Sequence, residues 1–284
     1  MKWAIRISIV AAILVGVTGI MSFVNWQGWA VQRYTHADLA NQLRPSLRYY
    51  VPEGTGPFPT VLQFHGCGGA EANQDEWGAF FADQGYAAII VDSLTPRGIA
   101  RIEAISTVCT AMQLTSLERA GDILAALHLA RALRFVDERQ IFLAGWSHGG
   151  WSIMDLMTMD LSTTSPPNLY GATAHDLNGV QGMVLIYPYC GFPSQSQSAG
   201  WQAILPGTAV LGADDTVAPA AQCVATFDRL SADGIDIEYS VYPSARHEFD
   251  VNYDEFLYQG NYLEEETMRA RDQALNFLNA HTNR

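Results

Sequence analysis

The sequence predicts an α/β fold in which a mostly parallel sheet is covered by helices on both faces. Short apolar runs typical of strands alternate with helical patterns along most of the chain, and turn-forming or glycine-rich segments follow several of these runs directly. Such alternation is typical of parallel sheets, because parallel strands are joined through helices. A chain of 284 residues is long enough for one large domain with a single core.

Six apolar runs are expected to form the strands of the sheet. They are Thr60–His65, Ala87–Val91, Gln140–Ala144, Gly182–Tyr187, Thr208–Leu211 and Asp236–Tyr242. Reactive groups of such sheets gather at the carboxyl ends of the strands, so a site is expected in the segments that follow these runs.

Helical segments are expected around these strands. They are Tyr34–Gln42 (a short helix or a connector), Ser116–Phe135, Trp151–Met159, Pro219–Ala232 and Glu264–His281. The stretch Asp160–Gly179 is rich in Ser, Thr, Pro and Asn, and we expect a surface loop there, with part of a lid or of a pocket wall as the alternative.

Composition excludes several classes of partner. The net charge of −13 disfavours nucleic acids and anionic membrane surfaces. Hydrophobic residues make up 49% of the chain and charged residues 16%, a balance that fits a well-packed globular domain. The sequence has neither a phosphate-binding P-loop nor the H-x-x-x-H or H-x-E spacing of metal ligands, so we expect no cofactor and no metal.

The first thirty residues differ from the rest of the chain. Lys2 and Arg6 precede an apolar run over residues 7–24, a pattern typical of a hydrophobic helix that serves as a signal peptide or as a membrane anchor. Both interpretations of residues 1–30 stay open. Both place residues 31–284 outside the cytoplasm, as an exported periplasmic or extracellular domain or a membrane-anchored one, because the positive end stays inside. A buried N-terminal helix would leave the two positive charges unexplained.

The sharpest motif is Gly145-Trp146-Ser147-His148-Gly149, which matches G-x-S-x-G. An apolar strand precedes it and a helix-compatible stretch follows, the context in which a sharp strand-to-helix turn exposes the serine hydroxyl above the sheet. The two glycines let the backbone and the helix pass closely, and the helix N-terminus favours negative charge beside the serine. The alternative is a chance glycine-rich turn. We predict that Ser147 is a nucleophile.

A base and an acid are expected further along the chain, in the order Ser, acid, His that accompanies this turn. His247 is the predicted base because it lies in the loop after the last strand, whereas His281 sits near the end of the terminal helix. The acid is expected just past the preceding strand, where Asp214 and Asp215 are adjacent. Spacing alone does not separate these two aspartates.

Acyl transfer also needs donors for an oxyanion. We expect the backbone N–H groups of His148, which follows the nucleophile, and of Cys67, in the glycine-rich loop His65–Gly69. The alternative for this loop is a plain turn into the next helix. His65 itself is expected to be structural and to pack beneath the loop.

Three side chains near these motifs are open to two interpretations. Arg97 is expected in a structural salt bridge to Asp92 or another carboxylate, with a substrate contact as the alternative. Trp146 and Trp151 flank the predicted nucleophile and are expected in the core, with a pocket wall as the alternative.

The four cysteines form no C-x-x-C pair, which argues against a zinc or thioredoxin-like site. Disulfides become possible in an exported protein. We expect Cys190 to pair with Cys223, because both should lie just past neighbouring strand ends, and the alternative is four buried thiols.

Four motifs together resemble the dienelactone hydrolase family, over roughly Thr60 to Asp250. They are HGCGG (residues 65–69), GWSHGG (145–150), GADDTVAP (212–219) and YPSARHEFD (242–250). The resemblance implies an α/β-hydrolase fold. It also assigns the acid to Asp215 rather than Asp214, because the family places the acid third after the glycine, and it matches His247 to the family's H-x-F.

The resemblance has departures that bear on the substrate. The founding members use a cysteine nucleophile where this chain has Ser147, and they hold a substrate carboxylate with arginines, one of them near the position of Asp250. Serine-bearing relatives imply a general hydrolase of small-molecule carboxylic esters that works through an acyl-enzyme. The alternatives are a peptidase or acyl-peptide hydrolase, and a non-catalytic binding protein on the same scaffold.

Overall fold

The computed structural model describes residues 31–252 and 262–282, together with the isolated positions 3, 6, 16 and 19. Its centre is a seven-stranded sheet with the strand order β1-β3-β2-β4-β5-β6-β7. The strands are β1 (Arg48–Tyr50), β2 (Phe58–Phe64), β3 (Ala87–Val91), β4 (Val136–Trp146), β5 (Val180–Ile186), β6 (Gly207–Gly212) and β7 (Ile237–Tyr242). Strand β1 pairs antiparallel with β3, and every other pair is parallel. All six strands predicted from sequence are confirmed within a few residues.

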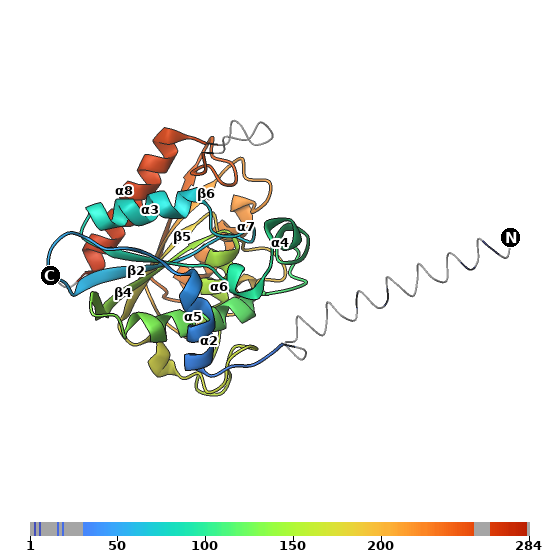
Figure 1. Ribbon diagram of the computed structural model, residues 1–284. Coiled ribbons are helices and arrows are strands. Elements are labelled where there is room, and N and C mark those ends of the chain that lie inside the picture. Colours follow the sequence, from blue (N-terminus) through green and yellow to red (C-terminus); the bar gives the residue numbers. More distant parts are fainter. Residues whose placement is uncertain are drawn as a thin grey trace.

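Helices cover both faces of this sheet. They are α2 (His36–Leu43), α3 (Ala72–Asp83), α4 (Arg101–Thr107), α5 (Ser116–Ala130), α6 (His148–Met157), α7 (Ala220–Ala232) and α8 (Glu264–His281), with short 3-10 turns η1 (Arg44–Ser46), η2 (Thr95–Arg97), η3 (Ala174–Leu177) and η4 (Gln195–Gln197). Helices α3 and α8 lie on one face, and α2, α5 and α6 lie on the other (Figure 1). This arrangement is the α/β-hydrolase fold.

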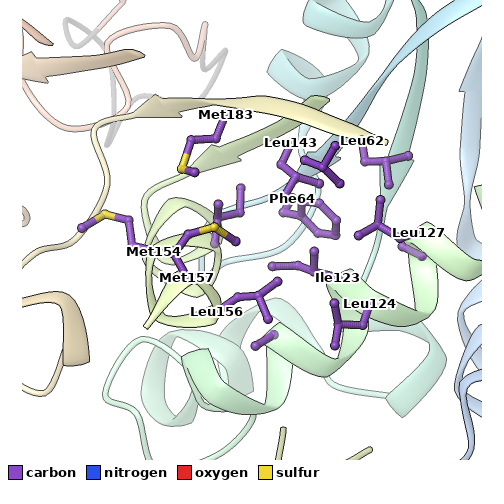
Figure 2. Packing of buried hydrophobic residues seen from close by; sticks show 14 of the residues in the cluster. Leu62, Phe64, Ile123, Leu124, Leu127, Leu143, Met154, Leu156, Met157 and Met183 are labelled. Carbon is purple, nitrogen blue, oxygen red and sulfur yellow. The ribbon is translucent and has the colours of Figure 1, made fainter. Parts of the chain in front are cut away.

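The core has two layers because strand side chains alternate between the two faces of the sheet. In β4, Ile141 and Leu143 pack with α5 and α6, whereas Phe142 and Ala144 pack with α3 and α8. Figure 2 shows the larger layer, where leucine, isoleucine and methionine side chains of α5 and α6 meet those of β2, β4 and β5. Because both faces are buried, the strands read as nearly continuous apolar runs, which made them visible in the sequence.

The signal peptide or anchor over residues 1–30 falls outside the continuously described residues and stays a prediction. Within the residues that the structure describes, no helix combines the length and apolarity needed to cross a membrane.

The stretch Asp160–Gly179 is a loop that contains one short 3-10 turn, η3. Tyr34 forms an isolated bridge with Leu169, and the Asn168 side chain donates to Asp122 at 3.2 Å. None of the described residues of this loop lines the cavity beside Ser147, so the loop reading fits and the lid reading does not.

Candidate active site

Ser147 occupies a sharp turn between the end of β4 and the first residue of α6. Its φ of 50° and ψ of −114° lie outside the regions that ordinary residues favour, and such strain concentrates at functional sites. The Ser147 N–H donates to the Ile186 carbonyl at 3.0 Å, which holds the turn against β5. The strain therefore persists because the surrounding sheet and helix impose it.

The glycines of the motif are required by close packing around this turn. A Cβ atom on Gly145 would come within 2.5 Å of the Gly150 nitrogen, and one on Gly149 would collide with the Phe64 carbonyl oxygen. The backbone of α6 thus crosses β2 and β4 at a distance that only glycine permits.

The structure brings the three predicted side chains into one chain of hydrogen bonds. His247 Nε2 lies 3.0 Å from Ser147 Oγ, and His247 Nδ1 lies 2.7 Å from Asp215 Oδ2. A carboxylate only accepts, so Nδ1 donates to Asp215 and Nε2 is left to accept the serine proton. The serine and the acid are buried, and the histidine is partly exposed where a substrate can approach.

Asp215, not Asp214, is the aspartate that contacts the histidine. Its Oδ1 accepts the backbone N–H groups of Val217 and Ala218, both at 2.8 Å, which orients Oδ2 toward His247. Asp214 is exposed to solvent. The two adjacent carboxylates that spacing could not separate are thus separated by burial.

A buried carboxylate, Asp250, fixes the loop that carries His247. Its Oδ2 accepts the indole N–H of Trp77 at 2.8 Å and of Trp146 at 2.9 Å, with an Asn73 amide at 3.3 Å. Its Oδ1 accepts the Tyr187 hydroxyl at 2.6 Å. All four donors are buried side chains, and together they occupy both oxygens of Asp250, so this carboxylate has a structural role.

Tyr187 connects this cluster to the base. Its ring packs on the His247 imidazole with the ring centroids 4.8 Å apart, while its hydroxyl reaches Asp250. Sequence reasoning identified neither Tyr187 nor Asp250 as part of the site. The only signal was their position, one just past β5 and the other three residues past the predicted base.

The glycine-rich loop after β2 lies beside Ser147, as expected. A Cβ atom on Gly66 would lie 3.6 Å from the Ser147 Cβ, and Cys67 and His148 line the same cavity as Ser147. His65 is buried beneath the loop and accepts the Ser93 N–H through Nε2 at 3.1 Å. Burial and the nearby Arg119 charge lower the pKa of His65 to about 3, so the ring is neutral and structural.

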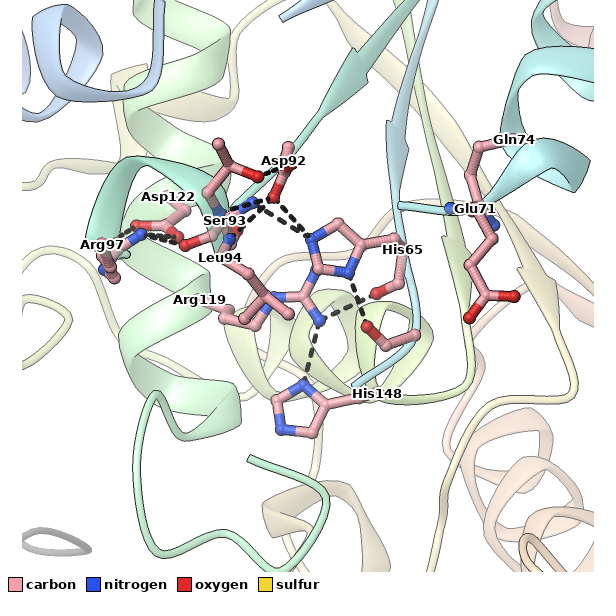
Figure 3. A network of polar contacts seen from close by, with 12 residues as sticks. His65, Glu71, Gln74, Asp92, Ser93, Leu94, Arg97, Arg119, Asp122 and His148 are labelled. Atoms are coloured by element: carbon pink, nitrogen blue, oxygen red, sulfur yellow. Dashed lines mark hydrogen bonds and ion pairs between the residues drawn. The ribbon is translucent and has the colours of Figure 1, made fainter. Parts of the chain in front are cut away.

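Arg119 of α5 bridges the two halves of the predicted oxyanion site. One of its terminal nitrogens donates to the His65 carbonyl at 2.8 Å and lies 3.1 Å from His148 Nδ1. Figure 3 shows this guanidinium between the two histidines. Burial lowers the pKa of Arg119 to about 10, so it stays charged at neutral pH. Burial and this charge hold the pKa of His148 well below its usual range.

The cavity beside Ser147 has a volume of about 360 Å³, within the range of small-molecule sites. Its apolar wall is formed by one side chain of α6, by side chains from the segments after β5 and β6, and by one disulfide. These are Trp151, Tyr189, Phe192, Pro193, Val217 and the Cys67–Cys109 bridge. Trp151 is therefore both a buried side chain and a pocket wall, and Trp146, which belongs to the core, also lines the smaller cavity beside Ser147.

Two disulfides join the described cysteines. The predicted Cys190–Cys223 bridge is confirmed, and the alternative of four thiols is wrong. The second bridge, Cys67–Cys109, was not predicted, and it ties the glycine-rich loop to the segment after α4. Neither bridge was fixed by spacing alone, because contact depends on how the loops pack over the sheet.

Arg97 forms the structural salt bridge that the sequence indicated, but its partner is Asp122 rather than Asp92. Two parallel contacts of 3.0 and 2.7 Å join the guanidinium to the buried carboxylate. Asp92 instead accepts backbone N–H groups of Leu94 and Thr95. Within the described residues, no group of His, Cys, Asp and Glu side chains is arranged to hold a metal ion.

Comparison with known families places this geometry in a wider group. The model of the dienelactone hydrolase family matches residues 47–282. The chain belongs to the dienelactone hydrolase family. Membership in this family supports a hydrolytic activity. No curated protein matches the chain.

Solved structures share the fold of this family member at low sequence identity. A Klebsiella pneumoniae protein assigned as a dienelactone hydrolase is 17% identical, with a TM-score of 0.63 over 82% of this chain and 92% of the other. Esterase 2 of Thermogutta terrifontis with propionate bound is 15% identical, with a TM-score of 0.59 over 84% and 91%. A sugar hydrolase from Lactococcus lactis is 17% identical, with a TM-score of 0.56 over 82% and 93%. At these identities the likeness establishes the fold alone.

Proposed function

We propose that the chain hydrolyses carboxylic esters through an acyl-enzyme on Ser147. The observation that carries this proposal is the continuous contact from Ser147 Oγ through the His247 imidazole to Asp215 Oδ2, at 3.0 and 2.7 Å. A serine hydroxyl is a weak nucleophile unless an adjacent base takes its proton during attack. His247 is placed and oriented for that role.

In the first half of the reaction, Ser147 Oγ attacks the ester carbonyl while His247 Nε2 takes the hydroxyl proton. Asp215 holds the imidazole in the required tautomer and stabilises the imidazolium. The carbonyl oxygen becomes negative and is stabilised by the backbone N–H groups of Cys67 and His148, each worth about 3 kcal/mol in the transition state. His247 then gives its proton to the alcohol, which leaves.

In the second half, water attacks the acyl group bound to Ser147. His247 takes a proton from the water, the tetrahedral species collapses, and the proton returns to Ser147 Oγ as the carboxylic acid leaves. Every proton is handled by side chains of the chain itself. The location of Ser147 at the first turn of α6 adds a helix N-terminus to the stabilisation of the oxyanion.

The test combines a serine-directed probe with a substrate screen. The wild-type chain is expected to react with a fluorophosphonate and to cleave para-nitrophenyl esters, and Ser147→Ala is expected to lose both reactions while keeping its melting temperature. Esters and peptide anilides with the same acyl group are compared directly. Faster cleavage of the anilides would replace the proposal with a peptidase, and labelling that survives Ser147→Ala would overturn it.

We also propose that residues 31–284 work outside the cytoplasm, with residues 1–30 as signal peptide or anchor. Two disulfides within the described residues support the proposal, because disulfides persist in oxidising compartments. The full chain is expressed, the host is fractionated, and thiols are alkylated before lysis. The expected result is a protein without reactive thiols outside the cytoplasm. Recovery from the cytosol with alkylated cysteines contradicts the proposal.

A further inference from the structure

We infer that the site disfavours esters that carry a carboxylate on either the acyl or the alcohol side. The inference rests on the proposed function and names its substrate class. Ser147 lines two cavities that share no other lining residue, and the inference follows from the side chains that line each of them.

The larger cavity offers no charge to a ligand. None of the described residues that line it is Lys, Arg, Asp or Glu. Its innermost wall is the indole of Trp151, and its outer wall carries Phe192 and Val217, which are 76% and 59% exposed. A neutral apolar group gains by leaving water for such a wall, whereas an ionised carboxylate loses its hydration without compensation.

The polar side chains of this wall are already engaged inside the protein. The Trp151 indole donates to Asp155 at 2.6 Å, the Tyr189 hydroxyl to the Phe192 carbonyl at 2.9 Å, and the Thr110 hydroxyl to the Ser106 carbonyl at 2.9 Å.

The remaining polar ring in this wall is His148. Its Nδ1 accepts from Arg119 at 3.1 Å, so the ring proton is on Nε2, which is buried and has no hydrogen-bond partner within the described residues. The wall therefore offers a carboxylate no cationic side chain, and its one unpartnered ring N–H is neutral and buried. The backbone N–H groups of Cys67 and His148 are assigned to the oxyanion.

The second cavity that Ser147 lines, about 20 Å³, has room for about one water molecule and carries acidic residues. Glu71 and Glu248 line it together with Trp146 and Tyr187. Glu71 forms an ion pair with Arg101, which occupies that guanidinium. A carboxylate that a substrate brought to the mouth of this cavity would meet the negative charge of Glu248.

Two arginines near the site, Arg97 and Arg119, are committed to other partners. Arg97 is held by Asp122 through two contacts, and Arg119 lies beneath the glycine-rich loop with its bonds directed at His65 and His148. Neither lines the two cavities that meet Ser147. Because both sides of Ser147 disfavour an anion, the inference does not depend on which side receives the acyl group.

Two matched pairs of esters test the inference. The first compares para-nitrophenyl para-toluate with the para-nitrophenyl monoester of terephthalate, which places the carboxylate on the acyl side. The second compares para-tolyl acetate with para-carboxyphenyl acetate, which places it on the alcohol side. Each kcat/KM is divided by the hydroxide-catalysed rate of the same ester to remove intrinsic reactivity. In both pairs the neutral ester is expected to be at least about tenfold better. Equal values, or preference for the anion in either pair, overturn the inference.

A charge introduced at the pocket mouth gives the matched variant. Phe192→Arg is compared with Phe192→Gln, which removes the same aromatic ring without adding a cation; the side chain at this position is mostly exposed. The arginine is expected to raise the anionic-to-neutral ratio of kcat/KM at least about fivefold over the glutamine variant for the pair whose varied group enters this cavity. If the anionic-to-neutral ratio of kcat/KM is unchanged for both ester pairs, the varied group of the substrate does not enter this cavity, which contradicts the proposal.

Binding to Ser147→Ala separates this inference from the proposed function. Methyl para-toluate and monomethyl terephthalate are titrated into this variant and followed by ligand-observed NMR. Absence of hydrolysis by the wild type, with the neutral ligand still bound more tightly, rejects the esterase and keeps the pocket preference. Active hydrolysis with the anionic ligand bound as well or better rejects the preference and keeps the esterase.

Discussion

The indole of Trp146 donates a hydrogen bond of 2.9 Å to the carboxylate of Asp250, and this contact joins the turn of the nucleophile to the loop of the base. Trp146 immediately precedes Ser147, and Asp250 follows His247 by three residues. The same carboxylate accepts Tyr187, whose ring packs on His247. One buried group thus sets the relative position of the two residues that exchange a proton.

Asp250→Ala is expected to weaken both folding and catalysis. Several buried donors, including both indoles and the Tyr187 hydroxyl, lose their acceptor, and the free energy of unfolding should fall by at least about 3 kcal/mol. Asp250→Asn should cost less, because its amide oxygen can still accept the donors now on Oδ2. Urea denaturation and kcat are measured for both, with Asp214→Ala as the exposed control. Equal stability of the alanine variant and the wild type contradicts this role.

Asp215→Asn is expected to lower kcat about 10⁴-fold with little loss of stability. The amide oxygen takes the place of Oδ1, which accepts two backbone N–H groups, so the NH₂ group faces His247 Nδ1. The imidazole is then driven to the tautomer with its proton on Nε2, which cannot accept the proton of Ser147. Asp214→Asn is the matched control and should retain wild-type kcat. A similar loss in both variants would show that burial and the contact with His247 do not identify the acid.

Arg119→Met is expected to lower kcat about ten- to hundredfold while changing KM little. The guanidinium fixes the His65 carbonyl and the His148 ring, so its loss frees the two segments that carry the predicted oxyanion donors. Stability should fall less than kcat suggests, because Nε and the second terminal nitrogen of Arg119 are buried without a partner among the described residues. Steady-state kinetics and thermal denaturation are measured together. A raised KM together with a lowered melting temperature would indicate a packing role instead.

The sequence predicted those features that local chemistry determines. The strands were visible because both of their faces are buried, and Ser147 was visible because a strained strand-to-helix turn requires glycine at fixed positions. Strand β1 was missed because it has three residues, pairs antiparallel at the sheet edge and contains Arg48 and two tyrosines.

The supporting residues of the site depend on tertiary packing and left little trace in the sequence. Arg119 lies on a helix that is buried nearly all round, where a charged residue would ordinarily mark the solvent face. Asp250 accepts donors from residues 63 to 177 positions away, and nothing local to it indicates burial. The Cys67–Cys109 bridge spans 42 positions between two loops, so its pairing follows from the fold.

Asp155 is expected to give folding stability a pH dependence opposite to that of an ordinary carboxylate. Burial raises its pKa from 3.8 to about 6, although Ser116, Trp151 and Ser194 donate to it. Between about pH 4 and pH 6 the folded chain therefore binds a proton that the unfolded chain does not, so this group stabilises the fold more as pH falls through that window.

The measurement for Asp155 is a difference between two unfolding series. The free energy of unfolding is determined from pH 7 to pH 4 for the wild type and for Asp155→Asn, whose side chain does not titrate, so that the other groups cancel. The wild type is expected to gain relative to the variant as pH falls, by up to about 3 kcal/mol for a shift of two pKa units. A difference that is flat, or that shrinks toward low pH, would mean that the donors around this carboxylate outweigh its burial.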